Sequence, residues 1–229
     1  MKKFLLAVAL VAGFACANAE EVDYAPKAGS FSTEVSFNPL SDNGNFFSNG
    51  GKLSAAYFVS DKLAVTLDFG LSGTNTKNVA KDPQDGKDLG YTKEYNGKFT
   101  LGLGVKYYFY NYKRINLYGG ANISYNHDFA GTKNYTYATD NTQEYWDWTN
   151  AGTGNGFGIH AITGIDFHIY KGLFLGIEIS AGFDDTVYCN TTNKVSIAGN
   201  VTETKNYAGG HNFTGGFNVT PMFRLGWAF

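Results

Sequence analysis

Residues 157–183 read FGIHAITGIDFHIYKGLFLGIEISAGF. In 157–170 and again in 173–183, mainly apolar residues fill every second position, and the glycines, the histidines, Asp166 and Glu178 lie between them. Strict period two indicates β-strands with one apolar face, because the apolar residues of a helix recur three and four positions apart. The intervening Lys171 and Gly172 predict a tight turn. The stretch therefore predicts a hairpin of two long antiparallel strands.

The same alternation recurs six more times along the chain, and no charged residue lies on the apolar face of any run. Each run has, or nearly has, the ~9–11 residues that a tilted transmembrane strand needs. The six runs are 30–38, 52–60, 62–72, 98–110, 115–126 and 217–229. The sequence thus predicts an all-β protein, an eight-stranded antiparallel up-and-down transmembrane β-barrel.

The links between these runs alternate in length. Three are tight, at 60–61, 111–114 and 171–172. Four are long and polar, namely 39–51, 73–97, 127–156 and 184–212. Three short periplasmic turns and four longer extracellular loops are the layout of outer-membrane barrels.

Aromatic residues gather at both ends of the apolar face, which is typical of the two interfacial girdles of a membrane barrel. The alternative is a soluble β-sandwich or lipocalin-like barrel, whose apolar face would be its core. The predicted outer girdle is Phe37, Phe69, Phe99, Tyr125, Phe157 and Phe183, and the inner girdle is Phe31, Tyr57, Phe109, Phe167, Trp227 and Phe229.

The N-terminus has the pattern of a cleavable signal peptide. Lys2 and Lys3 precede a short apolar run at 4–14, and Ala17-Asn18-Ala19 is a small-residue cleavage site. We therefore expect two segments, an exported leader at 1–19 and the barrel domain at 20–229. Acylation at Cys16 is the alternative, but Gly13-Phe14-Ala15 lack the aliphatic residue that such a site has. Cys189 is then the one cysteine left, so no intramolecular disulfide is expected.

The second face of the strands carries the charges, and it would line a lumen just filled by side chains. An isolated buried ion is costly, so these charges should be paired. We expect Arg224 to contact Glu34 and Glu178 from its neighbouring strands, and Lys106 to contact Asp68. The predicted lumen charge network is Glu34, Asp68, Lys106, Asp166, Glu178 and Arg224. It would rigidify the barrel or plug it, although glycines on the same face leave room for a narrow path.

Two chemical alternatives follow from individual residues. Ser124, His127 and Asp128 lie near the outer end of one strand, but Ser124 and His127 differ in parity, so a triad is not expected to assemble. Asp166 and His168 share a face and could contribute to a metal site with help from another strand. The prediction from these residues is no catalytic site, no cofactor and no metal.

The long loops contain aromatic residues among asparagine, threonine and glycine, a composition that suits adaptable binding surfaces. The alternatives are packing of these rings on the barrel rim and binding of a host or surface ligand. The candidate residues are Tyr135, Tyr137, Tyr145, Trp146 and Trp148. The near-neutral formal net charge of -2 indicates no nucleic-acid partner.

The last strand ends on an alternating aromatic pattern that resembles the C-terminal signal read by the barrel-assembly machinery. The stretches STEVSFNP (32–39), TGIDFHIYKGLFLGIEI (163–179) and RLGWAF (224–229) are similar to small outer-membrane barrels of the OmpA, OmpX and OmpW type, and to porin-family barrels of Bacteroidota. The residues of the signal are Phe223, Leu225, Gly226, Trp227 and Phe229.

This resemblance implies an integral outer-membrane protein but no single activity. With the predicted charge network, we expect a structural or limited-permeability role with a plugged lumen. A surface adhesin or ligand-binding protein is the alternative, and a lipid-modifying enzyme is a remote one. The expected partners are outer-membrane lipid and the assembly machinery, with the barrel as a monomer. Pro221 lacks an N–H for the ladder, so it predicts a bulge or local break in the last strand.

Overall fold

The computed structural model describes residues 27–37, 51–138, 143–207 and 209–229, and for 216–221 the backbone only. The predicted leader at 1–19 and most of the predicted loop at 39–51 lie outside these residues. The described chain contains eleven strands and no helix, hence no helix long and apolar enough to cross a membrane. The strands are β1 (Phe31–Phe37), β2 (Lys52–Ser60), β3 (Leu63–Lys81), β4 (Asp88–Tyr112), β5 (Ile115–Thr136), β6 (Tyr145–Thr149), β7 (Gly154–Tyr170), β8 (Leu173–Tyr188), β9 (Thr191–Ile197), β10 (Asn200–Asn206) and β11 (His211–Ala228).

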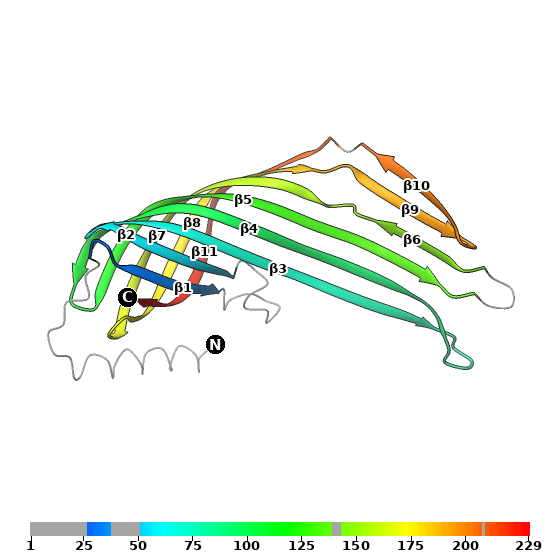
Figure 1. The fold of residues 1–229 in the computed structure, drawn as a ribbon, viewed down its shortest axis with the longest axis horizontal. Coiled ribbons are helices and arrows are strands. Elements are labelled where there is room, and N and C mark those ends of the chain that lie inside the picture. The colour runs from blue at the N-terminus through cyan, green and yellow to red at the C-terminus, as the bar shows by residue number, and fades with distance from the viewer. Residues whose placement is uncertain (1–26, 38–50, 139–142, 208) are drawn as a thin grey trace.

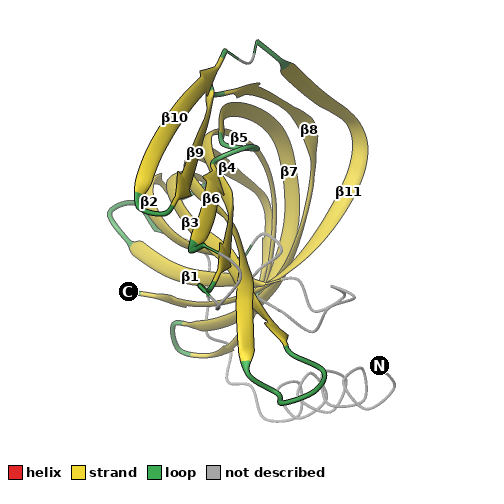
Figure 2. Cartoon of the chain, turned by 90° about the vertical axis from the view of Figure 1, so that its right-hand side faces the viewer, coloured by secondary structure: helices red, strands yellow, loops and turns green. Residues whose placement is uncertain are grey.

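Eight of these strands close into a ring, as predicted. β1 pairs with both β2 and β11, and the pairing of β5 with β7 completes the circle, every pair being antiparallel. Figure 2 shows the strands curving around a common interior. Closure leaves the backbone groups of the ring paired, which is the condition for crossing a bilayer with strands.

The three predicted tight turns join β2 to β3, β4 to β5 and β7 to β8. Lys113 and Lys171 lie in two of them with φ of 51° and 46°, the left-handed conformation that such short connections need. All three turns lie at the same end of the ring as the C-terminus (Figure 1).

The burial pattern is inverted relative to a soluble protein. Most buried side chains of the described residues are polar or charged, whereas the exposed surface of the ring is lined by large apolar residues such as Leu53, Leu103 and Ile159. A soluble sandwich would bury that apolar face instead. The alternation read from the sequence therefore places the apolar face outward and the charges inside.

The predicted long connections are not irregular loops in the segments the structure describes, because strand pairing continues into them. β3 and β4 stay paired without interruption from the ring to Ala80↔Gly90, far beyond the predicted ends of both strands. β5 continues to Thr136, and β6, β9 and β10 add to its outer part in the order β5-β6-β9-β10. The result is an arched open sheet that projects from one side of the barrel mouth (Figure 1).

Apolar alternation does not mark these extensions, because both of their faces are polar. The segments 73–81 and 88–97 contain threonine, tyrosine and valine, which favour strands, but few aliphatic residues in period two. Most side chains of the outer part of β3 are exposed on both faces. Without one buried face, the strand leaves no hydrophobic signal in the sequence.

Aromatic pairs lie at both ends of the apolar surface. At the turn end, the rings of Phe31 and Phe229 are 6.4 Å apart. At the other end, Phe69 contacts Phe99 at 5.6 Å, and Tyr125 lies 5.5 Å from Phe157. The last strand has a register shift between Gly216 and Thr220, directly before Pro221, where the sequence predicts an irregularity.

Candidate functional site

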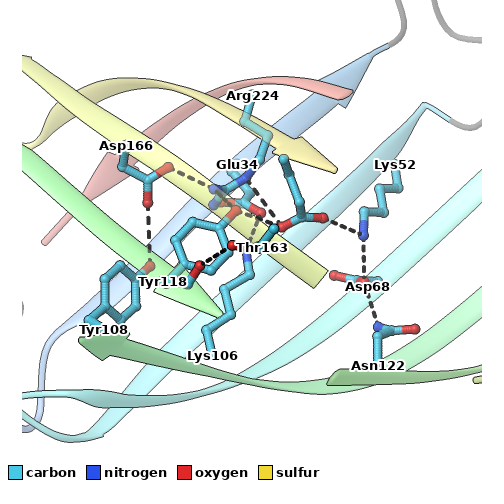
Figure 3. A network of polar contacts seen from close by, with 11 residues as sticks. Glu34, Lys52, Asp68, Lys106, Tyr108, Tyr118, Asn122, Thr163, Asp166 and Arg224 are labelled. Carbon is cyan, nitrogen blue, oxygen red and sulfur yellow. Dashed lines mark hydrogen bonds and ion pairs between the residues drawn. The ribbon is translucent and has the colours of Figure 1, made fainter. Parts of the chain in front are cut away.

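The interior of the ring holds a cluster of ionic contacts centred on Arg224 (Figure 3). The Arg224 guanidinium forms an ion pair with Glu34 through Nη2, and Nη1 donates to Asp166 Oδ1 at 2.7 Å. Its Nε lies 3.9 Å from Glu178 Oε2. The expected contacts of Arg224 with Glu34 on β1 and Glu178 on β8 are therefore present, and Asp166 on β7 adds a third carboxylate.

Lys106 reaches the same two glutamates from the opposite wall. Its Nζ lies 3.1 Å from Glu34 Oε1 and 3.2 Å from Glu178 Oε2. Both carboxylates thus bridge Lys106 to Arg224, although the two cations belong to β4 and β11. This bridging ties β4 to the three adjacent strands β1, β11 and β8 across the lumen.

The predicted contact between Lys106 and Asp68 is wrong. Among the described residues, Asp68 instead pairs with Lys52 at 2.9 Å and accepts a hydrogen bond from Asn122 Nδ2 at 2.9 Å. Lys52 also lies 3.6 Å from Glu178 Oε1, which links this outer pair to the central cluster. The long Lys106 side chain points toward the glutamates because they supply two carboxylates within its reach.

The cluster contains three cations and four carboxylates, and all but Lys52 are almost completely buried. Arg224 is only 2% exposed and Lys106 4%. Removing one charged side chain from such a network leaves its buried partner uncompensated, which costs about 3–5 kcal/mol of stability. The arrangement therefore fixes the positions of several strands relative to one another.

Two tyrosines that the sequence analysis did not assign to the network are part of it. Tyr118 donates a hydrogen bond to Glu178 Oε2 at 2.7 Å, accepts one from Arg224, and has Lys106 Nζ 4.9 Å from its ring centroid. Tyr108 donates to Asp166 at 3.4 Å. Both residues have inward parity in their strands, which is the one sequence signal that could have identified them.

Two cavities lie on opposite sides of this cluster. The one at the turn end has a volume of about 210 Å³ and is lined by Asn116, His168 and Phe174 among others. The one at the open end has a volume of about 400 Å³ and is lined by Lys52, Asp68 and further polar residues. None of Arg224, Glu34, Lys106, Glu178 and Tyr118 lines either cavity. The cluster thus separates the two.

The histidine candidates lie apart from one another. His168 contacts Asn116 Nδ2 at 3.0 Å near the turn end, and His160 lies 3.1 Å from Asp184 Oδ2 near the open end. In the part of the chain that the structure describes, no group of three or more His, Cys, Asp and Glu side chains could hold a metal ion.

Ser124, His127 and Asp128 do not converge. Ser124 and Asp128 have inward parity, whereas His127 has outward parity and contacts Asn155 Oδ1 at 2.8 Å. Ser124 instead lines the cavity at the open end, together with His160 and Asp184. The alternation of side chains along β5 therefore separates the three residues.

The aromatic candidates of the predicted loops lie on the arched sheet. Tyr135, Trp146 and Trp148 occupy one face, together with Tyr91, whose ring stacks on Tyr135 at 5.4 Å. Tyr145 lies on the other face, where its hydroxyl donates to Asp147 at 3.2 Å. Tyr137 follows directly after β5. Strand pairing thus fixes the arrangement of residues that the sequence predicted to lie in long loops.

One of these tyrosines is electrostatically perturbed. The Tyr135 hydroxyl donates a hydrogen bond to the Glu144 carboxylate, and this bond raises the pKa of Tyr135 to about 12. The bond joins the end of β5 to the segment before β6, and so helps to fix the aromatic face.

The residues of the predicted assembly signal lie on β11 and at its end. Leu225, Trp227 and Phe229 are exposed on the outer surface, as the alternation requires. Gly226 faces inward, where the ring of Phe174 occupies the space that a side chain at 226 would need. Phe223 is half-buried on the outward side of the same strand. The assignment to assembly remains a prediction.

Comparison with known proteins gives a family and a fold. The model of the family described as "Putative OmpA-OmpF-like porin family" matches residues 43–229. No curated protein matches the chain.

Among solved structures, a major outer membrane protein from Thermus thermophilus matches with 14% sequence identity and a TM-score of 0.50, covering 87% of this chain and 99% of that chain. OprG from Pseudomonas aeruginosa matches with 15% identity and a TM-score of 0.40, covering 89% of this chain and 97% of that chain. At 14% identity, the likeness to the Thermus thermophilus protein concerns the fold alone.

Proposed function

Because this chain belongs to the OmpA-OmpF-like porin family, whose members are outer-membrane β-barrels, we propose that it is a plugged barrel with a structural and limited-permeability role. The observation that carries the proposal is the ionic cluster that separates the two cavities. Water and small solutes can enter the cavities from either end, but continuous passage requires the Arg224 contacts to break.

The energetics of the cluster support a closed resting state. Arg224 and Lys106 share two carboxylates, so moving either cation leaves Glu34 and Glu178 partly uncompensated. Such a rearrangement in a narrow, buried lumen is costly. Openings should therefore be rare and brief, and the conductance of the open state should be limited by the small diameter of an eight-stranded ring.

The same proposal includes how the protein reaches the outer membrane and assembles there. The leader at 1–19 would direct export, and the C-terminal aromatic pattern would be read by the barrel-assembly machinery. The short turns would then face the periplasm and the arched sheet the outside, as in other outer-membrane barrels. We further propose that the barrel functions as a monomer in contact with outer-membrane lipid.

Planar-bilayer recording of the full chain tests the plug. The wild type is expected to be silent apart from rare openings, and Arg224→Ala should conduct steadily because its removal takes away the cation that holds three carboxylates. Arg114→Ala is the matched control, since Arg114 lies at a turn and donates to the Ile169 carbonyl at 2.6 Å.

Folding is monitored in parallel by the shift in gel mobility between boiled and unboiled samples. If Arg224→Ala does not fold, Lys106→Met replaces it, because methionine removes the charge and keeps much of the volume. Steady current through the wild type would overturn the plug. So would folded variants of Arg224 or Lys106 that are as silent as the wild type.

A further inference from the structure

A row of lysines crosses the outer face of the arched sheet. Lys77 on β3 lies directly opposite Lys93 on β4, and Lys93 lies directly opposite Lys133 on β5. The row continues through Trp148 on β6 to Lys194 on β9. Like charges directly opposite one another on neighbouring strands are destabilising, so three in succession need an explanation.

The described residues supply no ion-pair partner for the first three lysines. Within the described ranges, none of Lys77, Lys93 and Lys133 forms an ion pair, whereas Lys194 pairs with Glu203 at 3.2 Å. Lys77 Nζ lies 4.4 Å from the ring centroid of Tyr91, and Lys133 Nζ lies 5.4 Å from that of Trp146. These aromatic contacts position the ammonium groups but leave their charge uncompensated.

The rings beside the lysines form an ordered platform. The phenol of Tyr95 lies across Gly131 on the neighbouring strand, where any side chain would displace it. Trp148 Nε1 donates to the Tyr95 hydroxyl at 3.1 Å, and the stacked pair of Tyr91 and Tyr135 flanks the lysine row on the other side. Amphipathic aromatic rings of this kind are enriched where apolar membrane meets polar headgroups.

This face is continuous with the apolar outer surface of the barrel. Lys93 and Phe99 have the same parity on β4, and the pairing of β4 with β3 and β5 shows no register shift between them. Six residues correspond to roughly 20 Å along the strand, or about 15 Å of height for a strand tilted by 35–45°. In the membrane orientation proposed above, the lysines thus lie just above the predicted outer girdle, at the level of the outer-leaflet headgroups.

We propose that this lysine and aromatic face binds the anionic, phosphorylated sugar headgroups of the glycolipid in the outer leaflet of the surrounding membrane. Phosphates would neutralise Lys77, Lys93 and Lys133, and sugar rings would pack on the flanking tyrosines and tryptophans. The lysine row is then the site where the sheet is anchored to the membrane surface. The proposal does not depend on whether the lumen conducts.

Titration of the detergent-folded full chain with phosphorylated rough lipopolysaccharide at physiological salt tests this site. The variant Lys77→Gln/Lys93→Gln/Lys133→Gln should bind on the order of 100-fold more weakly, since each lysine near an anionic surface contributes about fivefold. Chemical removal of the phosphates from the same glycolipid should weaken binding by the wild type to a similar extent.

The matched control is Lys62→Gln/Lys113→Gln/Lys171→Gln, which removes three lysines from the turns at the opposite end and should bind like the wild type. Both triple variants are checked for folding by gel mobility. Undiminished binding by the first variant, or an equal loss in the control, would overturn the proposal. Heparin is the probe for a soluble polyanion: if the first variant loses heparin binding but keeps glycolipid binding, the face serves a soluble ligand and the membrane assignment fails.

Discussion

The phenol ring of Tyr118 on β5 lies against Gly164 on β7, directly opposite it in the sheet, in the space that a side chain at 164 would fill. The ring is shared by both central cations, with Arg224 Cζ 5.1 Å and Lys106 Nζ 4.9 Å from its centroid. A glycine on one strand therefore sets the position of the aromatic ring around which the plug is assembled.

Gly164→Ala should disturb this arrangement. The added methyl group would overlap the hydroxyl end of Tyr118 and lie 2.8 Å from the Ile177 carbonyl oxygen. Overpacking of this kind typically costs about 1–3 kcal/mol of the free energy of unfolding. Urea titration of the detergent-folded protein measures the loss.

Gly119→Ala is its matched control, because a methyl group at Gly119 would meet Phe109 at 3.8 Å and the Ile162 carbonyl at 3.9 Å, which is ordinary contact. The two variants make the same change on neighbouring strands. Equal free energies of unfolding for the two variants would show that the structure tolerates a methyl group beside Tyr118.

A double-mutant cycle on Glu34 and Arg224 should show strong coupling. Each of Glu34→Gln and Arg224→Met leaves a buried partner uncompensated, so each should lower the free energy of unfolding by about 3–5 kcal/mol. The double variant should lose less than the sum of the two, with a coupling energy of about 0.5–3 kcal/mol. Strict additivity in urea titrations would contradict a direct energetic contact.

The variant Phe229→Ala should distinguish a role of the Phe229 ring in membrane assembly from a role in packing. The Phe229 backbone pairs with Phe31 in both directions, at 2.7 Å and 3.4 Å, and alanine retains these bonds. The variant loses the ring contact with Phe31 at 6.4 Å, worth about 0.5–1.5 kcal/mol. Refolding in detergent should therefore survive, while the folded amount in the outer membrane of expressing cells falls.

Phe213→Ala, on the outer part of the same strand, should reduce neither measurement. A Phe229→Ala variant that fails equally in cells and in detergent would indicate that the ring acts by packing alone and would remove the assembly assignment.

The hydroxyl of Tyr135 should titrate unusually late. Its hydrogen bond to Glu144 raises its pKa from 10.0 to about 12, so the folded state holds this proton more tightly than the unfolded state. The bond's contribution to stability is present below pH 10 and is lost as pH rises through about 12. Near-ultraviolet absorbance should show that Tyr135 is among the tyrosines that ionise late, near pH 12, in the wild type.

In Glu144→Gln this late-ionising tyrosine should shift toward lower pH, because the neutral amide no longer favours the protonated phenol. Asp147→Asn, which alters the hydrogen bond to Tyr145 on the opposite face, should leave the late transition in place. Identical titration curves for the wild type and Glu144→Gln would contradict the contact.

The extent of the strands shows which segments the sequence pattern can predict and which it cannot. Within the ring, one face is apolar and the other is polar, so the alternation marks the turn ends of β7 and β8, at Tyr170 and Leu173. On the outer part of β3, from about Gly73 onward, water lies on both faces and no residue type is required in period two. The strand there is held by pairing with β4, which is not visible in either segment alone.

The sequence by itself determined the class of the fold, the inward parity of the charges and the positions of the three turns. It could do so because side chains alternate with a period of two in any strand, whatever its partners. Only the tertiary structure decided which charges meet. Lys106 contacts Glu34, 72 residues away, rather than Asp68, and the three lysines of the arched sheet line up. Both outcomes depend on the stagger of neighbouring strands and on how far each side chain reaches across the ring, and no local pattern encodes either.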